Sequence, residues 1–133
     1  VPVVVNGDIV DLEAARAALT ESGAAAVMIG RGAQGQPWIV GQVGAALAGE
    51  LIRPTPQGDE LIELIAEHYE AMLVEYGTHV GVRAARKHLD WYLEAIGGPY
   101  DREVRKILLA TEDPKTVLAM LPTIYNGGWR QAA

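Results

Sequence analysis

AAVMIGRGAQGQPWIV (residues 24–39) places an apolar, strand-like run directly before three glycines, Gly30, Gly32 and Gly35. The spacing is G-x-G-x-x-G, the fingerprint of a turn that holds a dinucleotide at the start of a Rossmann helix. Glycines in such a turn let the backbone come close to a phosphate group. The stretch therefore leaves two possibilities: a Rossmann domain, or another parallel α/β architecture that binds a different phosphate.

The sequence that follows the glycine turn disfavours a Rossmann site. Such a site needs a next strand that ends in Asp or Glu about 20 residues further on, to hold the ribose. The nearest acidic residue is Glu50, which ends a predicted helix, and a proline-containing linker (51–59) comes next. A second βα unit also precedes the turn. NAD binding is therefore the less favoured interpretation.

The first third of the chain predicts two consecutive βα units. Val1–Val5 is an apolar, β-branched run of the kind buried on both faces of a parallel sheet, and Ala25–Ile29 is a second such run. Helices are expected over about 12–22, between Asp11 as cap and Gly23 as stop, and from Pro37 to about Ala48. This order is typical of a right-handed parallel unit.

Each expected strand ends in a polar, glycine-containing turn. Asn6-Gly7-Asp8 follows the first strand and Gly30-Arg31-Gly32 the second. On neighbouring strands of a (β/α)₈ barrel both turns would lie side by side on the carboxyl-end face, where the last loops commonly bind phosphate. Arg31 would add a fixed positive charge with paired donors. The alternative is that both are simply tight turns.

Beyond the linker the apolar spacing changes to a helical period, which predicts an all-α bundle of about four short helices. Gly77 and the glycines at 97–98 are expected to end the first two helices, Pro122 is expected to end or kink the last, and a frayed tail follows Asn126. We therefore expect two domains, 1–52 and 53–133. The expected apolar stripes are Leu61, Leu64, Ile65, His68 and Met72; Val82, Ala85, Leu89, Tyr92, Leu93 and Ile96; Val104, Ile107 and Leu108; and Val117, Leu118 and Leu121.

The net charge of −6 hides an uneven distribution. Residues 59–82 hold six acidic side chains and no basic one, whereas 83–106 hold six basic and four acidic. On one helix face lie Arg83, Arg86, Lys87, Asp90 and Glu94. The basic residues could contact RNA phosphates, but Asp90 and Glu94 also fit a solvated helix with intrahelical ion pairs. His88 could touch RNA or lie at the edge of the apolar stripe.

Composition excludes several kinds of site. With no cysteine among 133 residues, disulfides, thiolate metal sites and a thiol nucleophile are ruled out within this sequence. No apolar run is long enough to span a membrane. His68 falls on an apolar stripe and His79 is expected in a short turn, so neither has a partner at metal-ligand spacing. We expect no metal and no membrane partner.

Two motifs together resemble the tRNA-dihydrouridine synthases, most closely the bacterial B-type members. VPVVVNGDI (1–9) followed by VMIGRGAQGQPWI (27–39) is similar to the end of their catalytic barrel, and GVRAARKHLDWYL (81–93) to the basic helix of their C-terminal helical domain. The resemblance implies a cytoplasmic oxidoreductase that uses FMN and NADPH to reduce the 5,6 double bond of uridines in tRNA. By position it implies FMN contacts at Asn6, Gly7, Asp8, Gly30 and Arg31, and tRNA contacts at Arg83, Arg86, Lys87 and His88.

The chain also departs from that family. Its members supply a Cys, a Lys and a His from earlier barrel strands, so no catalytic residue is assigned here, and we expect an inactive fragment with the last two βα units of an incomplete barrel. Residues 1–30 would expose unpaired strand edges, so disorder, rearrangement or strand swapping between chains is expected there. The alternatives are another FMN or phosphate-sugar barrel with oligomerising helices, or a non-enzymatic helical nucleic-acid-binding module.

Overall fold

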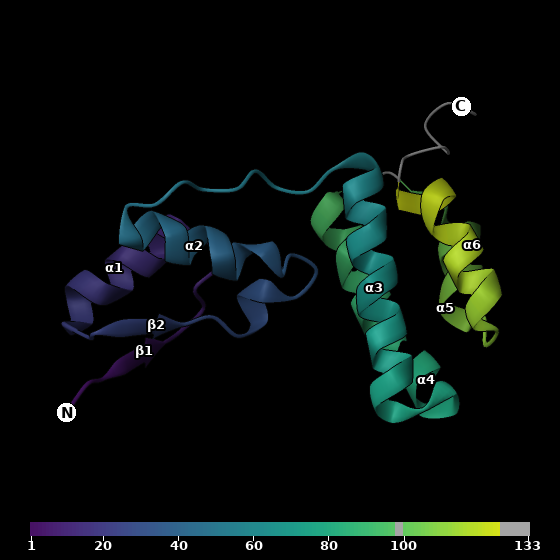
Figure 1. The fold of residues 1–133 in the computed structure, drawn as a ribbon, viewed down its shortest axis with the longest axis horizontal. Coiled ribbons are helices and arrows are strands. Elements are labelled where there is room, and N and C mark those ends of the chain that lie inside the picture. The colour runs from purple at the N-terminus through teal and green to yellow at the C-terminus, as the bar shows by residue number, and fades with distance from the viewer. Residues whose placement is uncertain (98–99, 126–133) are drawn as a thin grey trace. The chain divides into compact units, whose positions relative to one another are not determined.

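A computed structural model describes residues 1–97 and 100–125 (Figure 1). The chain forms two compact units, Val1–Thr55 and Pro56–Ala133, which are described separately below. The boundary lies three residues beyond the expected one, within the proline-containing linker (51–59). The tail after Asn126, with Trp129, and the glycine-proline pair at 98–99 lie outside the described residues.

The first unit is a parallel pair of strands with two helices. Its elements are β1 (Val4–Asn6), α1 (Leu12–Ser22), β2 (Ala26–Met28), a 3₁₀ turn η1 (Arg31–Ala33) and α2 (Trp38–Ala48). The strands pair in register, Val4 with Ala26 and Asn6 with Met28. The expected βαβα order is confirmed.

The two residues expected to mark the ends of α1, Asp11 and Gly23, do so in the structure. The Asp11 carboxylate accepts a hydrogen bond from the Ala14 N–H at 2.8 Å, which satisfies one of the donors left over at a helix start. Gly23 ends the helix in the left-handed region (φ 66°), where a side chain would be strained.

The strands differ from expectation in length and burial. Each has three residues instead of five, and Val4 and Met28 are 56% and 51% exposed. The expectation of burial on both faces is therefore wrong for this chain. The reason is that α1 and α2 lie on the same side of the two strands (Figure 1). The core of Ile9, Ala15, Ile39 and Val43 packs against Val27 there. β1 and β2 nevertheless form the expected parallel pair, so the structure does not show the rearrangement that was expected for residues 1–30. Strand swapping between chains stays a prediction.

The second unit is a helical bundle. Its helices are α3 (Gly58–Tyr76), α4 (Thr78–Ile96), α5 (Arg102–Ala110) and α6 (Pro114–Tyr125). Gly77 alone connects α3 to α4. Gly81 lets them approach closely, because an added Cβ would lie 2.8 Å from the backbone of Met72 and Leu73. The core residues are Leu61, Ile65, Tyr69, Met72, Val82, Ala85, Leu89, Tyr92, Leu93, Leu108, Val117, Leu121, Ile124 and Tyr125.

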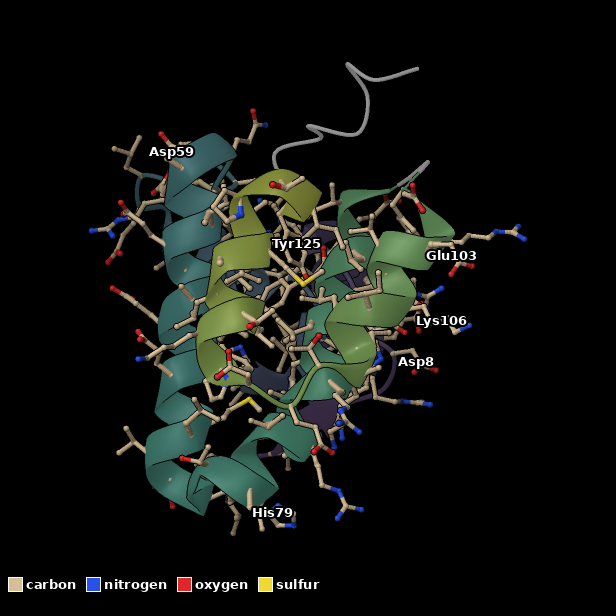
Figure 2. All side chains as sticks on the ribbon, turned by 90° about the vertical axis from the view of Figure 1, so that its right-hand side faces the viewer. Asp8, Asp59, His79, Glu103, Lys106 and Tyr125 are labelled. Atoms are coloured by element: carbon tan, nitrogen blue, oxygen red, sulfur yellow. The ribbon has the colours of Figure 1, made fainter. Side chains whose placement is uncertain are left out.

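Four details of the bundle differ from the sequence-based expectation. Pro122 does not end α6, which continues to Tyr125; the buried Tyr125 hydroxyl donates to the Leu89 carbonyl at 2.6 Å and anchors this last turn (Figure 2). Ile107 is 54% exposed rather than in the stripe. Tyr69 is a core residue that the stripes omitted. His79 belongs to the first turn of α4, not to a separate turn.

Candidate functional site

The turns after β1 and β2 meet at a cleft of about 270 Å³. Gly32 makes this approach possible, because an added Cβ would lie 2.0 Å from the Ile9 carbonyl oxygen. Asp8 takes a left-handed conformation (φ 43°), which Asp tolerates better than most residues, and this turns the chain back. The cleft is lined by Asn6, Gly7, Asp8, Ile9, Gly30, Arg31 and Gly32.

An ion pair joins the two turns across 23 residues of sequence. Arg31 Nη2 donates to Asp8 Oδ1 at 2.8 Å, and the two side chains are 80% and 82% exposed. Such an exposed pair contributes little to stability. It places the guanidinium at the cleft, where the other N–H donors of Arg31 stay available to an anion.

The cleft brings together all five residues that the sequence indicated as cofactor contacts, while their role stays a prediction. Gly32, which the sequence placed in the second turn without a cofactor role, also lines the cleft. Ile9 was missed, because a buried aliphatic residue carries no sequence signal for a binding site.

The basic face of α4 divides into exposed and inward-held side chains. Arg83 and Lys87 are exposed. Arg86 is only 33% exposed, and its Nη2 lies 3.6 Å from a carboxylate oxygen of Glu112. The Arg86 Nε is buried with no hydrogen-bond partner among the described residues. Arg83 and Lys87 are therefore the better-placed pair for an external anion.

The acidic residues of the same face do not form the intrahelical ion pairs that the solvated-helix alternative requires. Asp90 accepts two hydrogen bonds from Arg105 of α5, both at 2.6 Å, and Glu94 lies 4.0 Å from the same guanidinium. The Arg105 guanidinium also lies over the Tyr100 ring, 5.3 Å from its centroid. These contacts join α4 to α5 and leave Arg83 and Lys87 without a neutralising carboxylate among the ion pairs of the described residues.

His88 lies between two rings and is half-buried. Its ring centroid is 5.0 Å from those of His68 and Trp91, edge to face in both cases. Burial, the neighbouring His68 and the Lys87 ammonium all lower the pKa of His88, and burial lowers the pKa of His68. Both imidazoles are therefore neutral at pH 7, and His88 adds no positive charge to this face.

Within the described ranges, no group of three His, Cys, Asp or Glu side chains is arranged to hold a metal ion. Among the helices of residues 1–97 and 100–125, none combines the length and apolar character that crossing a membrane requires.

The fold and the two sites define a class of protein: a parallel βα unit with a polar cleft beyond its strands, combined with a helical bundle that carries an exposed basic face. The family model described as dihydrouridine synthase matches residues 1–126, and the chain belongs to this family.

Curated relatives bear the family's name. A probable tRNA-dihydrouridine synthase of Rhodobacter capsulatus is 48% identical over 95% of this chain. A tRNA-dihydrouridine synthase B of Xanthomonas axonopodis pv. citri is 43% identical over 95% of the chain, and a probable synthase of Rickettsia conorii is 39% identical. The chain spans 38%, 37% and 38% of the length of these three relatives, respectively.

Proposed function

We propose that this chain forms part of an FMN-dependent tRNA-dihydrouridine synthase. Residues 1–55 would be two βα units of its (β/α)₈ barrel and hold the phosphate end of FMN, and the helical unit would bind tRNA. Membership of the family and the names of the relatives support this activity. The observation that carries the cofactor assignment is the Arg31–Asp8 pair, which fixes a guanidinium at the cleft.

The cleft suits a phosphate in size and chemistry. Gly7 and Gly30 line it without side chains, and an added Cβ at either would meet no atom within 4 Å, so the space stays open. Arg31 would supply charge-assisted hydrogen bonds and Asn6 an amide for a ribityl hydroxyl. FMN reduced by NADPH would supply the hydride that reduces the uridine 5,6 double bond. Asp8 would keep the guanidinium in place while its other donors hold the anion.

The cofactor assignment is tested by Arg31→Ala in the whole enzyme that contains this chain. We expect FMN affinity to fall about 10- to 100-fold, the cost of losing charge-assisted hydrogen bonds to the phosphate. Arg16→Ala is the matched control, because Arg16 is exposed on α1 away from the cleft lining. FMN titration by fluorescence quenching measures the affinity. Equal FMN affinity in the two variants would contradict the assignment.

In the helical unit, exposed cations would contact tRNA phosphates. Arg83 and Lys87 lie four residues apart on α4, so they follow one line along the helix. Such contacts give affinity that falls steeply with salt and carries no sequence information. The inward-held Arg86 would contribute chiefly by packing and its Glu112 contact, and the neutral His88 by supporting its neighbours.

The tRNA assignment is tested by the double variant Arg83→Ala/Lys87→Ala of the full chain. Each phosphate contact contributes about 0.7 to 0.9 to the slope of log affinity against log salt, so we expect this slope to fall by about 1.5. Arg102→Ala/Lys106→Ala is the control, since it removes the same charge from two exposed positions of α5. Filter binding of tRNA at several salt concentrations gives the slopes. A loss no larger than that of the control would disprove a specific contact on α4.

A further inference from the structure

Four aromatic side chains form a continuous row from the core of the helical unit to its surface. Tyr92 is 2% exposed, and its hydroxyl lies 2.9 Å from His68 Nδ1. His68 contacts His88, and His88 contacts Trp91, each with ring centroids 5.0 Å apart and nearly perpendicular planes. We call these four residues the aromatic row. Its inner end is fixed in the core, and its outer end, Trp91, is half-buried.

The outer end of the aromatic row continues the exposed cations of α4. Arg83, Lys87 and Trp91 follow one another at four-residue spacing, so they lie along one line of the helix. The Lys87 ammonium lies over the Trp91 ring, 5.7 Å from its centroid. A positive charge therefore adjoins an aromatic surface that its neighbours hold in a fixed orientation.

We propose that Trp91 is a stacking platform for an unpaired base of the RNA, with Lys87 meeting the phosphate next to that base. The proposal rests on the tRNA binding proposed above and adds a contact of a different kind. Bases in loops have free faces that stack on aromatic rings, whereas the bases of a duplex are covered by their neighbours. The packing of His88 against Trp91 limits the ring's freedom before binding, so little ordering entropy is lost.

The structure favours RNA over a protein partner at this position. Along α4, the exposed cations Arg83 and Lys87 are followed by the Trp91 ring. Positive charges beside an aromatic surface complement single-stranded RNA, in which negatively charged phosphates alternate with bases that can stack. Glu94, one turn beyond, lies 4.0 Å from Arg105, so a guanidinium offsets its repulsion of phosphate. Stacking reads no particular base, so the platform would recognise exposed bases rather than a sequence.

The test compares Trp91→Leu with Trp91→Phe in the full chain, using tRNA and a fully paired RNA duplex as the two ligands. Stacking on an aromatic residue corresponds to about 5- to 150-fold in affinity per base. We expect Trp91→Leu to lose about that factor for tRNA and to leave the duplex affinity unchanged, while Trp91→Phe keeps most of the tRNA affinity. The salt slope should stay at the wild-type value in both variants.

A second measurement follows the folded wild-type chain directly. Stacking should quench tryptophan fluorescence when tRNA is added, and this part of the quench should vanish in Trp91→Phe. If Arg83→Ala/Lys87→Ala weakens tRNA binding but Trp91→Leu does not, or if Trp91→Leu weakens duplex binding equally, the platform is overturned while tRNA binding stands. If neither variant changes tRNA binding relative to its control, the proposed function of the helical unit itself fails.

Discussion

At Gly32 the two loops of the cleft lie too close together to leave room for a side chain. The Gly32 Cα lies so near the Ile9 carbonyl that a Cβ would be 2.0 Å from the oxygen and 3.2 Å from the Val10 Cα. These are backbone atoms, which cannot rotate away as the end of a flexible side chain can. The close approach of the two loops, which lets Arg31 reach Asp8, therefore depends on Gly32 having no side chain.

Gly32→Ala should consequently separate the two loops. We expect unit 1 to lose about 1–3 kcal/mol of stability, the usual cost of forcing a methyl group into occupied space. Gly44→Ala is the control, because Gly44 lies in α2 with open space around its Cα, where alanine stabilises a helix by about 0.5–1 kcal/mol. Urea unfolding followed by circular dichroism measures both changes. A Gly32→Ala variant as stable as Gly44→Ala would show that the loops can move apart without cost.

At the scale of elements, α3 and α4 depend on another close approach. An added Cβ at Gly81 would lie 2.8 Å from the Leu73 Cα and the Met72 carbonyl oxygen, so the helices would have to move apart. We expect Gly81→Ala to cost about 1–3 kcal/mol, although alanine is the better helix former by about 1 kcal/mol. The same urea experiment tests this, again against Gly44→Ala. A stabilised Gly81→Ala variant would mean that helix propensity outweighs the contact.

The elements that could be predicted from the sequence are those specified by local signals. Asp11 and Gly23 mark the ends of α1, and residues 82, 85, 89, 92 and 93 of the α4 stripe are all buried. The continuation of α6 past Pro122 could not be predicted, because it depends on a hydrogen bond between Tyr125 and Leu89, 36 residues apart. In the same way, helical spacing placed Arg86 among the exposed cations. In the structure its side chain is only 33% exposed and lies 3.6 Å from Glu112, which precedes α6 and is 26 residues away in the sequence.

At the scale of the whole molecule, charge and titratable groups are divided unequally between the two units. All three histidines lie in the helical unit, at positions 68, 79 and 88, and unit 1 has none. A change of pH around 6, where histidines ordinarily titrate, therefore acts on imidazoles of the helical unit and on none in unit 1.

The helical unit should lose stability as the pH falls through this range. The pKa values of His68 and His88 are lowered in the fold, chiefly by burial, so the folded chain favours neutral imidazoles. Their full stabilisation is present above the unfolded value of 6.5 and is lost progressively as pH falls through the lower folded pKa values. We expect the urea midpoint of the helical unit to fall between pH 7.5 and 5.5, and that of unit 1, which has no histidine, to change less. In His68→Asn/His88→Asn the midpoint should vary much less with pH. An unchanged pH dependence in that double variant would place the titrating groups elsewhere, and a midpoint that rises toward acid would reverse the sign derived from burial.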